Sequence, residues 1–274
     1  MRIKANAKIN VYLKVLGKNE NGYHDLDSLM VPINLFDVMD VKESEKDEII
    51  GMDIPLESNL IYKAIKLIRD TYGIKKKIRV EIEKNIPSFA GLGGGSSDAA
   101  AIIKALNKMW KLKLSDQEMC LFAEKLGSDV PFFIHNKPAI ISGRGEKIQI
   151  VDIHDIKGIL IFSDNKFSTK EVFNNMKEYT APYEEGLIIN NGKVVRQIYQ
   201  YVVNDMEKGI DIYQESAEIF KQKRQLIEYG ANCASMSGSG SSVFGLFDDN
   251  KKLNKAFNEL KKEYKKIWKF NVIK

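Results

Sequence analysis

Apolar and polar residues alternate along two short stretches of the chain, residues 5–15 and 77–83, with the period of two that is typical of β-strands. A longer extended stretch covers residues 29–41. Residues 58–72 instead place apolar side chains three and four positions apart, which predicts a helix. The N-terminal part therefore mixes strands and helices in an irregular order.

The middle of the chain predicts helices followed by a hairpin. A glycine-rich turn after Pro87 leads into an alanine-rich helix, and a second helix begins at the capping box of Ser115 and Glu118. That helix should end near Gly127, a natural left-handed residue. An apolar stretch follows, and residues 139–151 predict a β-hairpin that turns at 143–145.

The C-terminal part begins with a new strand at residues 158–164, after a polar stretch around His154 and Asp155 that is the best candidate boundary. The pattern then predicts a helix opened by Ser168 and Glu171, a longer amphipathic helical stretch over about 194–229, a strand over 242–247, a charged helix and a final strand near 268–272. We expect an α+β fold of two domains, residues 1–153 and 154–274.

The composition is that of an ordinary globular protein. Of 274 residues, 44% are hydrophobic and 29% charged, and the net charge of +5 comes from basic residues interspersed with acidic ones, which is weak evidence for a nucleic-acid partner. No apolar run approaches the roughly 20 residues of a membrane span, and no signal peptide is evident, so we expect a cytoplasmic protein. Cys120 and Cys233 lack metal-binding spacing and are expected to be core thiols.

The glycine-rich segment Gly91-Leu-Gly-Gly-Gly-Ser-Ser-Asp98 is the main candidate for chemistry. Consecutive glycines let backbone N–H groups approach an anion, and the following helix adds the partial positive charge of its N-terminus, which suits a phosphate chain. A P-loop would need a lysine after the glycines, and a dinucleotide-binding loop would need a third glycine at Ser96. From this segment alone, a simple Gly/Ser turn capped by Ser96 or Ser97 is an equally good interpretation.

Three further segments give this loop a context. Ala7-Lys-Ile-Asn10, Gly22-Tyr-His-Asp25 and Ala234-Ser-Met-Ser-Gly-Ser-Gly-Ser-Ser-Val-Phe244, together with the loop, resemble the galactokinase, homoserine kinase, mevalonate kinase and phosphomevalonate kinase (GHMP kinase) superfamily. The likeness is greatest to the members that act on a cytidine-diphosphate-linked methylerythritol in the non-mevalonate isoprenoid pathway. The matching segments occur in family order from residue 5 to residue 247.

This resemblance implies a two-domain fold with a ribosomal-protein-like N-terminal domain, a ferredoxin-like C-terminal domain and the active site in the cleft between them. It also implies an enzyme that uses ATP to phosphorylate the 2-hydroxyl of its small-molecule substrate, with no nucleic acid or membrane as partner. Phosphoryl transfer depends mostly on positioning and charge stabilisation, so few reactive side chains are required.

The resemblance implies two catalytic residues. Asp129 matches the aspartate that takes the proton from the attacking hydroxyl, and Lys8 matches a cation that stabilises the developing alkoxide. Alone, Asp129 would be a turn or helix-cap carboxylate, and Lys8 a solvated lysine on an exposed strand face. By alternation, Lys8 shares its strand face with Asn10.

The implied substrate contacts are Asn10, Tyr23, His24 and Thr169, with Tyr23 and His24 at the cytidine end. Without the motif, Tyr23 and His24 would be surface aromatics, and Thr169 a first-turn residue beside the Ser168 cap. The implied ATP-binding residues are Pro87, Ala90, Gly91, Leu92, Gly93, Gly94, Gly95, Ser96 and Ser97, and a third glycine-rich motif comprises Ser237, Gly238, Ser239, Gly240 and Ser241.

Magnesium is expected with ATP, and Ser97 is the candidate protein ligand. The sequence departs from the family pattern at Ser88 and Phe89, where a small residue is usual, which puts the adenine or ribose fit in doubt. Mevalonate, phosphomevalonate and homoserine kinases would share the phosphate loop but should not need Tyr23 and His24. A nucleic-acid-binding protein would leave the glycine loops without a role.

Overall fold

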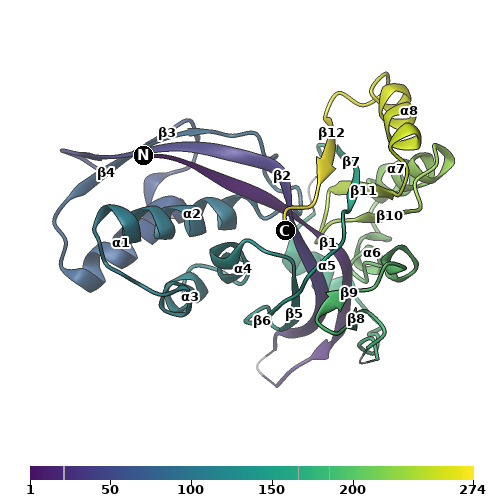
Figure 1. Cartoon of the computed structure of the whole chain (residues 1–274), viewed down its shortest axis with the longest axis horizontal. Coiled ribbons are helices and arrows are strands. Elements are labelled where there is room, and N and C mark those ends of the chain that lie inside the picture. The colour runs from purple at the N-terminus through teal and green to yellow at the C-terminus, as the bar shows by residue number, and fades with distance from the viewer. Residues whose placement is uncertain (21, 166, 185) are drawn as a thin grey trace. The chain divides into compact units, whose positions relative to one another are not determined.

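The computed structural model describes residues 1–20, 22–165, 167–184 and 186–274 (Figure 1). Its strands are β1 Arg2–Lys18, β2 His24–Ser44, β3 Glu48–Ile50, β4 Lys77–Glu83, β5 Ala139–Gly143, β6 Lys147–Ile150, β7 Lys157–Phe162, β8 Ile189–Asn190, β9 Lys193–Val194, β10 Cys233–Met236, β11 Ser242–Phe247 and β12 Ile267–Asn271. Its α-helices are α1 Leu60–Tyr72, α2 Gly94–Met109, α3 Asp116–Glu124, α4 Val130–His135, α5 Thr169–Asn175, α6 Glu207–Ile210, α7 Ser216–Glu228 and α8 Asn250–Leu260.

The chain forms two compact units. Unit 1 comprises Met1–Ala7, Leu35–Ser88 and Gly93–Asn136, and unit 2 comprises Lys8–Asn34, Phe89–Leu92 and Lys137–Lys274. The long strands β1 and β2 and the glycine-rich loop each contribute residues to both units.

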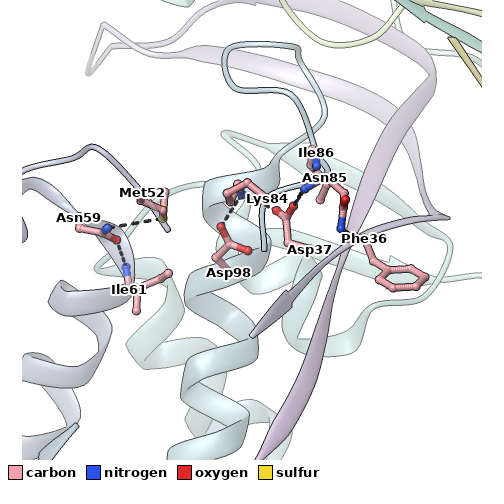
Figure 2. A network of polar contacts seen from close by, with 9 residues as sticks. All are labelled: Phe36, Asp37, Met52, Asn59, Ile61, Lys84, Asn85, Ile86 and Asp98. Atoms are coloured by element: carbon pink, nitrogen blue, oxygen red, sulfur yellow. Dashed lines mark hydrogen bonds and ion pairs between the residues drawn. The ribbon is translucent and has the colours of Figure 1, made fainter. Parts of the chain in front are cut away.

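Unit 1 combines helices α1 to α4 with the sheet strands β2, β4 and β3. Strand β4 pairs antiparallel with residues 38–44 of β2, and β3 pairs parallel with β4. Every second residue of β4 is buried, as its alternating sequence predicts. Asn59 caps the N-terminus of helix α1, since its side chain accepts the Ile61 N–H (Figure 2), and the left-handed Gly73 caps the C-terminus. Helices α1 and α4 both pack against α2.

Unit 2 contains an antiparallel sheet in the order β10-β11-β7-β12. All six residues of β11 are buried, and helix α7 packs against β10 and β11. Residues 26–30 of β2 pair with β5, and β5 and β6 form the predicted hairpin. One apolar cluster joins the inner side chains of β7 and β11 to those of α7 and α8. Burial of this cluster holds the unit together.

Two sequence predictions of helices are wrong. Helix α3 ends at Glu124, its C-cap Lys125 has a right-handed backbone, and Gly127 does not adopt the left-handed conformation that the sequence predicted for it. The long helix over 194–229 is confined to α7, apart from the single turn of α6.

The break before α7 has a physical cause. Asn204 and Asp205 are both buried, and their side chains bond the backbone of distant segments. Such contacts compete with the hydrogen bonds of a continuous helix. Residues 130–135, which the sequence marked only as apolar, form the short helix α4. Cys120 and Cys233 are free thiols, half-buried rather than in the core.

Candidate active site

Lys8 and Asn10 form a buried polar pair on β1. Lys8 is 4% exposed and Asn10 2% exposed, so Lys8 is not a solvated surface lysine. The Lys8 ammonium donates to Asn10 Oδ1 at 2.5 Å, and Asn10 Nδ2 donates to Ser28 Oγ at 2.9 Å. Burying a lysine ammonium costs free energy unless the ammonium is paired. The burial of Lys8 therefore favours a functional role for this side chain.

The first half of the glycine-rich loop lies against this pair in unit 2. The Leu92 carbonyl accepts the Lys8 backbone N–H at 3.0 Å, and the Gly91 carbonyl accepts the Ser237 hydroxyl at 3.0 Å. The same hydroxyl accepts the Asn10 backbone N–H at 3.4 Å. Segments from the beginning, middle and end of the sequence therefore meet at Lys8.

Gly91 permits the close approach of the loop to the third motif. Its φ is +71°, and a Cβ added there would lie 1.9 Å from the Ser237 carbonyl oxygen. Gly238, at φ +56°, follows Ser237, and a Cβ added to it would lie 3.2 Å from the Lys8 ammonium nitrogen. Gly91 leaves no room for a side chain, Gly238 leaves little, and both have the left-handed backbone that favours glycine, which explains glycine at these two positions.

The second half of the loop starts helix α2 in unit 1. Gly93 is its left-handed N-cap, and the first helical hydrogen bond runs from the Ser97 N–H to the Gly93 carbonyl at 2.9 Å. The N–H groups of Gly94, Gly95 and Ser96 precede this bond and point toward the helix N-terminus. This is the arrangement that binds phosphate groups.

Phe89 occupies a left-handed conformation, with φ +56°, and its residue is 72% exposed. Residues other than glycine rarely adopt this backbone, whereas a glycine would adopt it without strain. Before it, Pro87 is half-buried and Ser88 is exposed, whereas Ala90 is buried.

His24 lies against aromatic side chains in unit 2. Its ring stacks on Phe173 of α5 with 4.6 Å between centroids and 10° between planes, and the Tyr179 hydroxyl is 3.4 Å from His24 Nε2. Burial, together with the charge of Lys18, lowers the pKa of His24, so the ring is neutral at pH 7. Tyr23 is 57% exposed and carries the Arg144 guanidinium over its ring instead. The two neighbours in sequence thus have different surroundings.

Thr169 lies at the exposed start of α5, where its hydroxyl is 2.8 Å from the Ser239 hydroxyl of the third motif. The Ser168 side chain caps this helix as the sequence predicts. Of the other members of the motif, Gly240 and Ser241 are buried.

Asp129 belongs to unit 1 and occupies the N-cap position of α4. Its side chain is half-buried and makes no capping hydrogen bond within the described structure. Asp129 thus occupies a helix-cap position, but its carboxylate does not make the hydrogen bond to the backbone by which a capping residue stabilises a helix.

Comparisons with known proteins identify the family of this chain. The model of the GHMP kinases N-terminal domain matches residues 59–137, and that of the GHMP kinases C-terminal domain matches residues 188–266. The 4-diphosphocytidyl-2-C-methyl-D-erythritol kinase of Thermoanaerobacter pseudethanolicus is 38% identical over 272 residues, covering 96% of this chain and 93% of that protein. This chain belongs to the GHMP kinase family.

Solved structures of the family share the fold. The crystal structure of a 4-(cytidine 5'-diphospho)-2C-methyl-D-erythritol kinase superposes with a TM-score of 0.85 at 26% identity, covering 99% of both chains. A homoserine kinase from Cytophaga hutchinsonii gives a TM-score of 0.69 at 17% identity, covering 99% of this chain and 94% of that one, and shows the fold alone. The predicted two-domain GHMP kinase fold is confirmed, and this member of the family is a small-molecule kinase that uses ATP.

No cluster of three or more His, Cys, Asp or Glu side chains suited to a metal ion occurs in the described ranges. The candidate ligand Ser97 lies in the first turn of α2 and is 2% exposed, and it directly follows the three residues whose N–H groups precede the first helical hydrogen bond. A single hydroxyl fits Mg²⁺, which keeps several waters and relies on substrate phosphates. None of the helices in the described part of the chain has the length and hydrophobicity to span a bilayer.

Asn204 and Phe173 contact candidate site residues, and the sequence analysis did not single out either of them. Asn204 is 3% exposed, and its amide donates to the carbonyls of Met236 and Gly238, both at 2.8 Å. It thereby holds the third motif in place beside Lys8. Neither residue lies in a glycine-rich segment, and no sequence motif marks either of them.

Proposed function

We propose that this kinase transfers the γ-phosphate of ATP to the 2-hydroxyl of 4-diphosphocytidyl-2-C-methyl-D-erythritol, giving the 2-phosphate and ADP, in the non-mevalonate isoprenoid pathway. The relatives bearing this name support the substrate. The observation that carries the proposal is the buried Lys8, held between Asn10 and the backbone of two glycine-rich loops.

The proposed reaction needs little covalent help from the protein. Asp129 accepts the proton of the 2-hydroxyl, whose oxygen bonds to the γ-phosphorus while the bond from that phosphorus to the bridging oxygen of ADP breaks. The Lys8 ammonium stabilises the negative charge that develops on the transferring group. The N-terminal N–H groups of α2 bind the phosphates of ATP. When bound, Mg²⁺ supplies charge neutralisation for these phosphates, with Ser97 as its protein ligand.

We also propose that His24, with Phe173, binds the cytosine ring, and that Tyr23, Asn10 and Thr169 contact the substrate. Aromatic faces stack on bases, and the neutral His24 ring can read a base edge. Pro87, Ala90, Gly91 and Leu92 would complete the ATP site.

The proposed domains are residues 1–153, for ATP binding, and 154–274. The matched family models lie within these bounds. These domain bounds follow the family division and differ from the two compact units. The units divide β1 between them and place the β5–β6 hairpin in unit 2. We propose a cytoplasmic location, because the cytoplasm supplies ATP.

A coupled assay of ADP release tests the substrate. Turnover should occur with the cytidylyl substrate and fail with mevalonate and homoserine, added separately at equal concentration. Turnover with mevalonate or homoserine alone would overturn the proposal, as would salt-sensitive RNA or DNA binding without any turnover.

A further inference from the structure

A cavity of about 500 Å³ lies within unit 2. Residues of strands β1, β2, β5 and β6 line it (Figure 1), together with residues 182–184 and 186–189. Its apolar walls include Leu16, Ile140 and Ile189, and Asp27 and Tyr12 are among its polar residues. Cavities of this size that combine apolar walls with a few polar groups are typical of small-molecule sites. We call it the Asp27 cavity.

The Asp27 cavity is separate from the proposed cytidine end of the active site. Asp27 follows His24 by three residues along β2, so the two side chains point to opposite faces of the strand. Ser142 of β5 is paired with Asp27 in the register, and residues directly opposite each other share a face. Ser142 lines the cavity, whereas His24 and Phe173 are not among the described residues that do so.

Asp27 is a buried carboxylate that lacks a cationic partner. It is 9% exposed, and no lysine or arginine in the described part of the chain forms an ion pair with it. Its Oδ1 accepts the Tyr12 hydroxyl at 2.8 Å, and its Oδ2 accepts the Tyr183 backbone N–H at 3.1 Å. A carboxylate can accept about four hydrogen bonds, so both oxygens can accept another donor. Because buried charges are normally paired, this carboxylate favours a cation beside it.

The other groups that line the cavity also favour a cation. The rings of Tyr12 and Tyr183 meet edge to face, with 5.0 Å between centroids and 87° between planes. The Tyr183 ring already carries the Lys14 ammonium, 3.6 Å from its centroid, which shows that this ring attracts positive charge. Among the described residues that line the cavity, the charged ones are Asp27 and Glu184, both acidic.

We propose that the Asp27 cavity binds a small organic cation, a protonated amine on a short apolar or aromatic body. The ammonium group donates to the Asp27 carboxylate beside the Tyr12 hydroxyl, and the body packs against the apolar walls. A neutral molecule of the same shape leaves the carboxylate without a cation, so the site selects by charge. The proposed phosphoryl transfer does not use Asp27, and the inference therefore goes beyond the proposed function.

Calorimetric titration of the full chain with 2-phenylethylammonium, at pH 7 and fixed ionic strength, tests the inference. This probe should bind with a stoichiometry of one. Its neutral analogue 2-phenylethanol should bind about 10- to 150-fold more weakly, the value of one hydrogen bond between charged groups. Absence of binding by the ammonium probe, or equal affinity for the two probes, would overturn the inference.

Three variants locate the bound probe. Asp27→Asn keeps the shape of the side chain and an acceptor for Tyr12 but removes the charge, so affinity for 2-phenylethylammonium should fall about 10- to 150-fold. Asp40→Asn removes an exposed carboxylate from the same strand and should bind like the wild type.

The third variant, Ser142→Phe, fills the cavity from β5, leaves Asp27 in place and should abolish binding of both probes. It decides the question if Asp27→Asn fails to fold, as judged by circular dichroism. Wild-type affinity in folded Asp27→Asn or in folded Ser142→Phe would show that the amine binds elsewhere and would contradict the proposal.

Discussion

The substitution Gly91→Ala should both destabilise the protein and remove most of its activity. An added Cβ would lie 1.9 Å from the Ser237 carbonyl oxygen and 3.1 Å from the Gly240 nitrogen. Carbon and oxygen atoms of neighbouring segments normally stay about 3.3 Å apart or more, so the third motif has to move by more than about 1 Å. A displacement of about 1 Å at a site that positions a reacting group can cost about 100-fold in rate.

The expected loss of stability combines two effects. A left-handed backbone at φ +71° costs alanine about 1–2 kcal/mol relative to glycine, and forcing a carbon into a packed site costs about 1–3 kcal/mol more. The free energy of unfolding should therefore fall by about 2–5 kcal/mol in denaturant titrations.

Gly192→Ala is the matched control for this prediction. Gly192 has a φ of +74°, but a Cβ added to it would meet nothing within 4 Å. Gly192→Ala should lower the free energy of unfolding by the backbone strain alone, about 1–2 kcal/mol, and should leave turnover unchanged. If Gly91→Ala and Gly192→Ala have the same stability and the same turnover, the close packing of the loop on the third motif contributes to neither, and the prediction is wrong.

Four other substitutions test the proposed roles. Asp129→Asn should lower kcat about 10²- to 10⁴-fold without changing ATP affinity, and near-wild-type turnover of the folded variant would remove Asp129 as the base. Lys8→Met should lower kcat while calorimetric ATP binding is largely kept, and unchanged kcat would exclude a role at the transferring phosphate. His24→Ala should raise KM for the cytidylyl substrate about 5- to 150-fold, the value of one lost base stack, with KM for ATP unaltered; equal changes in both would misplace the cytidine site. Gly94→Val should abolish ATP binding, and wild-type affinity would make the loop a simple turn.

The sequence predicts elements well where a local pattern determines them. Strand β4 coincides with the alternation over 77–83, the capping box at Ser115 starts α3, and the N-cap Ser168 starts α5. Local patterns fail where a side chain bonds a distant segment. The buried Asn204 interrupts an otherwise helical pattern because its amide holds the third motif, an interaction that no spacing within 194–229 reveals.

The candidate site shows the same contrast between what a local pattern predicts and what contacts between distant segments determine. The alternating strand pattern predicted that Lys8 and Asn10 share a face, and the structure adds that both are buried against two glycine loops. Phe173 stacks on His24 from a helix about 150 residues later, and Lys84 joins Asp37 to Asp98 across three elements (Figure 2). These contacts arise only when the chain folds, so sequence spacing carries no sign of them.

The most direct measurement of the central claim is the phosphorus NMR spectrum of the reaction product. The enzyme is incubated with ATP and 4-diphosphocytidyl-2-C-methyl-D-erythritol until ADP release stops. The account predicts a single new phosphomonoester signal whose intensity matches the ADP formed, with carbon–phosphorus coupling placing it on the 2-position and with the diphosphate bridge intact. A phosphoryl group on any other oxygen, or ADP accompanied only by inorganic phosphate, would contradict it.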